Sequence, residues 1–190
     1  MAAATGLIIF SCWIIFLIYW LVSAFRQKPV AERRSFSSMV GYRAPLSLGG
    51  LLLLFPGFRH PPFTWSLTPQ TDSVRIMGAA ICVFGLAVTL WARSTLGANW
   101  SSEVAFKKGH ELIRKGPYRF VRHPIYSGLL LMCLGSAIPV GELRSWLGFV
   151  LLVAGFWIKL RQEERLMLRH FPDQYPAYRK EVKAVVPFVI

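Results

Sequence analysis

Acidic side chains are scarce in this sequence. Aspartate and glutamate together number 9, against 22 lysines and arginines, so the formal net charge is +13. Charged residues of both signs make up only 16% of the chain, whereas about a quarter is usual for a soluble domain. The shortage of charge argues against a soluble protein, and the surplus of positive charge raises the question of an anionic partner.

Cysteine is scarce as well. Cys12, Cys82 and Cys133 each lie within an apolar run, without a CxxC pair and without a nearby histidine at metal-ligand spacing. We therefore expect three buried thiols, no disulfide framework and no metal site.

Apolar residues are abundant instead, at 54% of the chain. The apolar run from Gly6 to Phe25 is long enough, at 1.5 Å per residue, to cross a hydrocarbon core of about 30 Å. A cleaved signal peptide is the alternative, but basic residues follow this run rather than precede it. We predict five membrane spans, approximately at Gly6–Phe25, Met39–Phe58, Val74–Trp91, Pro124–Val140 and Leu143–Leu160.

The basic residues are distributed unevenly around these spans. Only Arg59, Arg75 and Arg144 fall in segments expected on one side of the membrane, and the other 19 fall on the opposite side. This asymmetry predicts a multi-pass protein with its amino terminus outside and its carboxyl terminus in the cytoplasm. The compartment would be the inner membrane of a bacterium or the endoplasmic reticulum of a eukaryote. Anionic lipid headgroups are then a sufficient partner for the positive charge, and nucleic acid is not needed.

The expected fold is therefore an all-α integral-membrane helical bundle, formed by a single domain over residues 1–190. Residues 1–92 would supply the first three spans, and residues 93–190 a cofactor-binding and catalytic half with a pocket on the cytosolic side. Gly78 and Gly85 are two helical turns apart on one face, so we expect another helix to approach closely there.

The first polar segment that could carry chemistry leads into the predicted fourth span. Gly116-Pro117-Tyr118 is typical of a turn, and it delivers His123 to a helix start at Pro124, where a missing amide hydrogen costs nothing. The amides and the partial positive charge of a helix N-terminus can hold a carboxylate or a phosphate. The alternative is that Arg122 and His123 are only interfacial anchors that contact lipid phosphates.

The second polar segment lies at the end of the predicted fifth span. Glu164 interrupts an apolar seam formed by Trp157, Leu160, Leu168 and Phe171 at helical spacing. A carboxylate in such a seam costs several kcal/mol unless a cation answers it. One interpretation is that Glu163 and Glu164 pair with basic neighbours on the same helix; the other is that one of them binds a cationic ligand. The neighbours in question are Lys159, Arg161 and Arg165.

Together these segments resemble the isoprenylcysteine carboxyl methyltransferase family over about residues 99–188. The residues that carry the resemblance are His110, Gly116-Pro117-Tyr118, Arg122-His123-Pro124, Tyr126, Gly128, Glu163-Glu164, Phe171, Tyr175 and Tyr178. The resemblance implies that S-adenosylmethionine is the cofactor. The residues implied to bind it are His110, Glu111, Leu112, Ile113, Tyr118, His123, Pro124, Ile125, Tyr126 and Glu163, with Glu164 beside them.

The resemblance also implies a methyltransferase whose acceptor is small or lipophilic, with an isoprenylcysteine-like carboxylate or a thiol. Family members place an arginine one turn before the cofactor-binding glutamate to hold the acceptor carboxylate, and here that position is Lys159, with Arg161 two residues on. We expect Lys159 or Arg161 to orient the acceptor. Lysine keeps the charge but lacks the planar two-pronged grip of arginine.

Three other functions fit the sequence less well. A phospholipid N-methyltransferase is the nearest rival, although an amine acceptor requires a base that the sequence does not obviously offer. A sterol-reductase-like enzyme that uses NADPH is typically a much longer protein. A non-enzymatic membrane scaffold that binds anionic lipid would not use Glu163 and Glu164, because acids do not attract phosphate.

Overall fold

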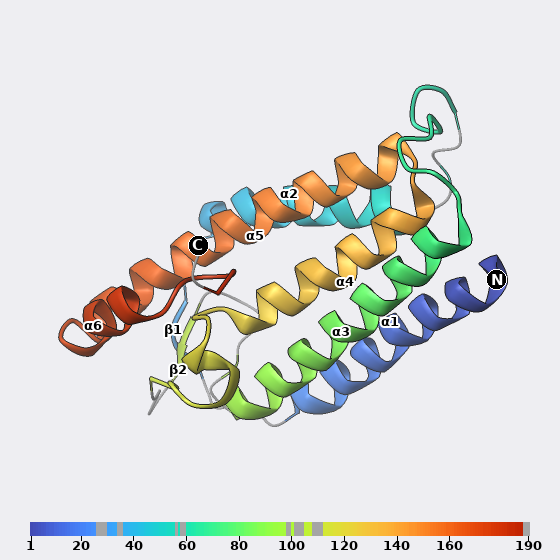
Figure 1. The fold of residues 1–190 in the computed structure, drawn as a ribbon. Helices are drawn as coiled ribbons and strands as arrows, with labels where there is room; N and C mark the ends of the chain where they lie inside the picture. The colour runs from blue at the N-terminus through green and yellow to red at the C-terminus, as the bar shows by residue number, and fades with distance from the viewer. Residues whose placement is uncertain are drawn as a thin grey trace.

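The computed structural model describes residues 1–25, 30–33, 36–55, 57, 60–97, 100, 105–107 and 112–187. Within them five long helices run side by side in alternating directions, and a short sixth helix follows at one end (Figure 1). They are α1 (Ala2–Ala24), α2 (Phe36–Leu54), α3 (Asp72–Leu96), α4 (Pro124–Val140), α5 (Leu143–His170) and α6 (Gln174–Glu181). The predicted helical bundle is confirmed at this level.

Two short strands depart from the all-α expectation. β1 (Val30–Arg33) pairs antiparallel with β2 (Ala105–Lys107), and a short 3-10 helix, η2 (Gly116–Arg119), lies before α4. β1 follows α1 and β2 follows α3, and these two helices end at the same end of the bundle (Figure 1). Two connecting segments that leave the bundle side by side can satisfy their backbone groups by pairing, a long-range contact that no local sequence pattern announces.

In the part of the chain that the structure describes, three helices are long and apolar enough to cross a membrane, namely α1, α3 and α5. The apolar part of α2, from Met39, and the whole of α4 are shorter. The chain is thus a multi-pass helical membrane protein, while the count of five crossings stays a prediction. Cys12, Cys82 and Cys133 are buried thiols, as expected.

Close glycine contacts hold neighbouring helices together. A Cβ atom at Gly85 would lie 2.6 Å from the Gly128 carbonyl oxygen, and one at Gly78 would lie 2.8 Å from that of Gly135. These contacts join α3 to α4 and confirm the expected close approach at Gly78 and Gly85. α2 meets α5 in the same way at Gly49, so the helices form two packed groups, α1–α3–α4 and α2–α5 (Figure 1).

The helix boundaries agree best where proline and glycine mark them. α4 begins at Pro124, and it ends before Gly141, which has the left-handed φ of 67°. α3 instead continues past the expected end at Trp91 to Leu96. The reason is that Arg93 is buried, and its guanidinium donates to the carbonyl oxygens of Gly97 at 2.7 Å and Ser23 at 2.8 Å. These carbonyl groups lie at the C-terminal ends of α3 and α1, where a positive charge is favourable. Arg93 is therefore compatible with the last turns of α3.

Candidate functional site

The buried carboxylate of Glu164 joins α5 to the segment before α4. Glu164 is 4% exposed, and the Nε and Nη2 atoms of Arg122 donate to its Oε1 at 2.8 and 2.5 Å. The Nε atom of Arg179, on α6, lies 3.5 Å from Oε2. These two cations come from the segment before α4 and from α6, whereas one interpretation of the sequence offered basic neighbours on α5.

Arg122 also fixes the chain that follows α6. Its Nη1 donates to the carbonyl oxygen of Arg179 at 3.2 Å and to that of Val182. Arg122 was considered as an anchor in the sequence but not as the partner of Glu164. The signal was present, because a glutamate in an apolar seam requires a cation, and Arg122 adjoins the histidine already assigned to the site.

His123 lies between the two glutamates. Its Nδ1 is 3.6 Å from Glu163 Oε2, and its Nε2 is 3.5 Å from Glu164 Oε1. The ring stacks on that of Tyr126, with centroids 5.6 Å apart and planes 5° apart. The Tyr126 hydroxyl in turn donates to Glu163 Oε1 at 2.5 Å. The structure thus brings together four of the residues that the sequence assigned to a cofactor site.

Lys159 and Arg161 do not lie on the same face of α5. The Nζ atom of Lys159 lies 5.4 Å from the centroid of the Tyr126 ring and 5.7 Å from that of Tyr42, on α2. Arg161 is exposed, with its guanidinium 4.9 Å over the Trp157 ring. Residues two apart on a helix do not share a face, so Lys159 is the one of the pair beside Tyr126.

The turn before α4 contributes a buried phenol. Tyr118, in η2, belongs to the same core cluster as Tyr126 and Leu160, and its carbonyl oxygen accepts a hydrogen bond of 2.5 Å from the Tyr178 hydroxyl. Burial, together with the nearby charge of Glu163, raises the pKa of the Tyr118 hydroxyl. The phenol is therefore neutral at physiological pH and offers an uncharged aromatic surface.

The remaining predicted cofactor residues differ in their surroundings. Pro124 and Ile125 are buried in the first turn of α4. Ile113 packs against the Tyr118 cluster, whereas Leu112 packs against the cluster that contains Tyr178. His110 and Glu111 lie outside the described residues.

The start of α4 is partly covered by the chain's own C-terminal segment. The amides of Arg122 and His123 donate to the carbonyl oxygens of Lys183 at 2.8 Å and Ala184 at 2.9 Å. Ser127 Oγ donates to the Val185 carbonyl oxygen at 2.6 Å. The C-terminal segment therefore occupies two backbone amides immediately before this helix.

An apolar cavity of about 170 Å³ adjoins the polar cluster. Tyr126 forms part of its wall, together with Phe156, Trp157 and Leu160 on α5. One end of a ligand in this cavity would therefore contact hydrocarbon, while the other end would lie near the residues around Tyr126. Such a site suits an amphipathic molecule with a charged head.

Comparisons with known proteins relate this chain to one family of enzymes. The sequence model of the isoprenylcysteine carboxyl methyltransferase (ICMT) family matches residues 76–169, which extend from α3 through α5. The chain is 26% identical over 181 residues to the protein-S-isoprenylcysteine O-methyltransferase of Saccharomyces cerevisiae, covering 92% of this chain and 75% of the relative.

Two further relatives of the same name match over shorter regions. The protein of Schizosaccharomyces pombe is 35% identical over 96 residues, which is 49% of this chain and 41% of the relative. The human protein is 28% identical over 128 residues, or 66% of this chain and 45% of the relative. The matches thus span less than half of these two relatives.

Proposed function

The chain belongs to the isoprenylcysteine carboxyl methyltransferase family, and from this premise we propose that it transfers a methyl group from S-adenosylmethionine to a lipophilic acceptor with a carboxylate, of the isoprenylcysteine type. The observation that carries this proposal is the position of Lys159. Its ammonium lies beside Tyr126, which forms part of the apolar cavity's wall and also bonds Glu163. A cation for a carboxylate, a cavity for a hydrocarbon tail and an acid for a cationic donor are therefore adjacent.

We assign the donor to Glu163 rather than to Glu164. The side chain of Glu164 is 5% exposed and is occupied by Arg122 and Arg179, whereas that of Glu163 is 23% exposed. S-adenosylmethionine supplies a sulfonium-activated methyl group, and its ammonium and ribose suit a partly accessible carboxylate. Glu163 would bind these groups, and His123 would face the carboxylate of the cofactor. Tyr118 supplies a neutral aromatic wall for an adenine.

Positioning is the main contribution that these residues can make to methyl transfer. A carboxylate acceptor is already ionised near neutral pH, so the chain needs no base to activate it. Holding donor and acceptor in line then supplies most of the acceleration. The ammonium of Lys159 would hold the acceptor carboxylate, while the apolar cavity would restrict the tail to one direction of approach.

The site would lie at the cytoplasmic face of the membrane. Arg75 and Arg144 lie in the first turns of α3 and α5, at the same end of the bundle as the start of α1 (Figure 1), and Arg59 lies outside the described residues. The polar cluster, α6 and most of the basic residues lie at the opposite end. The positive-inside asymmetry supports an outer amino terminus and a cytoplasmic carboxyl terminus.

The test is the chemical fate of the methyl group. Detergent-purified protein is incubated with radiolabelled S-adenosylmethionine and an N-acylated farnesylcysteine. We expect label in a base-labile ester, because a methyl ester releases methanol in alkali. When a small thiol replaces farnesylcysteine, label in an alkali-resistant product would indicate a thioether. Label in phospholipid, when vesicles replace farnesylcysteine, would support the phospholipid N-methyltransferase instead and overturn the proposed acceptor.

A further inference from the structure

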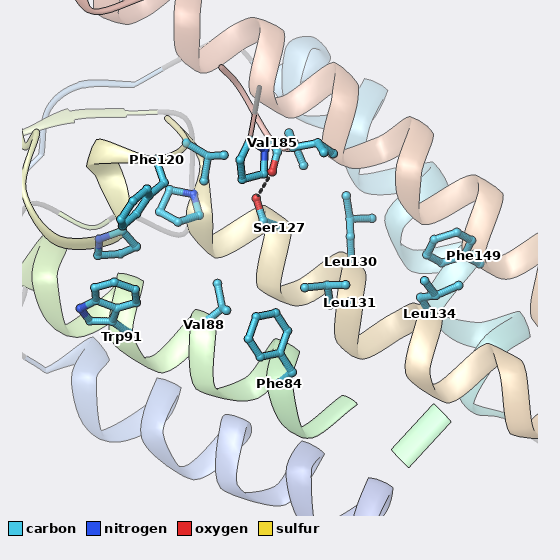
Figure 2. Close-up of a pocket in the computed structure, with 15 residues that line it drawn as sticks. Phe84, Val88, Trp91, Phe120, Ser127, Leu130, Leu131, Leu134, Phe149 and Val185 are labelled. Atoms are coloured by element: carbon cyan, nitrogen blue, oxygen red, sulfur yellow. Dashed lines mark hydrogen bonds between the residues drawn. The ribbon is translucent and has the colours of Figure 1, made fainter. Parts of the chain in front are cut away.

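A second and larger apolar groove runs along α4. It has a volume of about 440 Å³ and is formed mainly by α3 and α4 (Figure 2). Phe84, Val88 and Trp91 line it from α3, and Leu131 and Leu134 line it from α4. Ser127 is the one hydroxyl-bearing residue of its lining, and its Oγ is already bonded to the Val185 carbonyl oxygen (Figure 2). The groove therefore offers its occupant hydrocarbon contact.

The groove is distinct from the cavity next to Tyr126. Leu130, Val185 and Val186 line both spaces and so form the partition between them. Tyr126 and the α5 residue Leu160 line the smaller cavity, and neither lines the groove. An occupant of the groove is consequently separate from the acceptor of the proposed methyl transfer.

Positive charge is gathered at one end of the groove. Phe120 lines it there, and the guanidinium of the exposed Arg119 lies 5.2 Å over the Phe120 ring. Lys183 is exposed beside Val121, another lining residue with which it forms a backbone bridge. Arg119 forms no ion pair with a carboxylate in the part of the chain that the structure describes. From this end the groove follows α4 from Pro124 to Leu134, a distance of roughly 15 Å at the rise of a helix.

We propose that this groove binds one acyl chain of an anionic phospholipid from the surrounding bilayer, with its phosphate held by Arg119 and Lys183. The apolar lining would pack against the acyl chain, and the basic side chains would form charge-assisted hydrogen bonds with the phosphate. This inference does not depend on the acceptor or on the methyl donor.

A second copy of the chain fits the groove less well. In a two-fold symmetric dimer built on this face, the same surface patch would be used by both copies. Arg119 and Lys183 would then lie either near the same two residues of the second copy or against its apolar surface. Like charges at an interface oppose association, and so does a buried charge without a partner. A lipid phosphate neutralises the same charge.

The test uses the position of Trp91 in the groove. The protein is reconstituted into phosphatidylcholine vesicles that contain a fixed mole fraction of one brominated lipid. In one set of vesicles this lipid is phosphatidylglycerol with brominated acyl chains, and in the other set it is phosphatidylcholine with brominated acyl chains. Bromine quenches tryptophan fluorescence at contact distance. We expect brominated phosphatidylglycerol to quench more than brominated phosphatidylcholine, and we expect Trp91→Phe to remove most of that excess.

Two substitutions separate a specific site from ordinary lipid contact. Arg119→Gln should weaken the preference for phosphatidylglycerol roughly fivefold, as expected for one basic residue at an anionic surface. Val88→Phe should reduce the excess quenching by filling the groove. Val83→Phe is its matched control, because Val83 is on the same helix but lines a different cavity, against α1. Arg119 is exposed, so its substitution leaves the fold intact.

Equal quenching by the two brominated lipids would overturn the proposal, as would an excess that survives both Arg119→Gln and Val88→Phe. A dimer in detergent that Val88→Phe dissociates would also overturn it, in favour of a second copy as the occupant.

Discussion

Both the Nε and the Nη2 atoms of Arg122 donate to one oxygen of Glu164, across 42 residues of sequence. This pair is buried on both sides, with side chains 7% and 5% exposed. It connects the segment before α4 to the end of α5, and through Arg179 it reaches α6. We infer that Glu164 is a structural acid that holds the site together, while Glu163 is the acid that faces a ligand.

The first prediction concerns the stability of this pair. Arg122→Ala leaves a buried carboxylate without its main partner, which typically costs about 3–5 kcal/mol. We expect a large drop in the thermal midpoint of the protein in detergent. Arg75→Ala is the control, because Arg75 and Asp72 form an ion pair that is 26% and 56% exposed, and such surface pairs contribute about 1 kcal/mol or less. Equal effects of the two substitutions would contradict a structural role for Glu164.

The second prediction concerns the methyl donor. Glu163→Gln and His123→Ala should each weaken the binding of S-adenosylhomocysteine at least tenfold, about 1.4 kcal/mol, as measured by calorimetry. The thermal midpoint of Glu163→Gln should stay near that of the unmodified protein, because Tyr126 can still donate to an amide oxygen. Glu181→Gln, on the exposed surface of α6, is the control. Unchanged affinity in both site variants would place the donor elsewhere.

The local parts of the site could be predicted from the sequence. Pro124 and Gly141 bound α4 through backbone chemistry that each residue carries with it, and the spacing of Gly78 and Gly85 indicated the face that α4 approaches. The positions of His123 and Glu163 were likewise indicated by their motifs. That these two side chains come within 3.6 Å of each other depends on how α4 and α5 pack.

Contacts set by the whole fold could not be predicted in this way. Arg122 and Arg179, which pair with Glu164, lie in the segment before α4 and on α6, whereas the sequence offered only the neighbours on α5 or a ligand as partners. The pairing of β1 with β2, and the C-terminal segment that binds the amides of Arg122 and His123, join parts of the chain with no local pattern in common. Arg93 shows the same limit, because its burial between two helix ends is invisible in its own helix.

The third prediction compares two glycines in helices. Gly85→Ala places a Cβ atom 2.6 Å from the Gly128 carbonyl oxygen, so α3 and α4 must separate. We expect a destabilisation of about 1–3 kcal/mol. Gly50→Ala, in α2, meets no atom within 4 Å, and alanine is favoured over glycine inside a helix by roughly 0.5–1 kcal/mol. The thermal midpoints should therefore move in opposite directions, and equal shifts would contradict the close packing of α3 against α4.

The last prediction distinguishes a carboxylate acceptor from a thiol acceptor. If Lys159 holds a carboxylate, Lys159→Gln should raise the KM for farnesylcysteine about tenfold or more, while the affinity for S-adenosylhomocysteine stays the same. Lys159→Arg should preserve or lower that KM, because a guanidinium grips a carboxylate with two parallel hydrogen bonds. Arg161→Gln is the matched control, since Arg161 is exposed on another face of α5. A neutral thiol acceptor makes no use of this charge, so a KM that is insensitive to Lys159→Gln would exclude the carboxylate.

The affinity for S-adenosylhomocysteine separates binding of the acceptor from a structural role of Lys159. Lys159 adjoins Tyr126, and the Tyr126 hydroxyl donates to Glu163. If the role of Lys159 were only structural, Lys159→Gln would also weaken donor binding through this hydrogen bond.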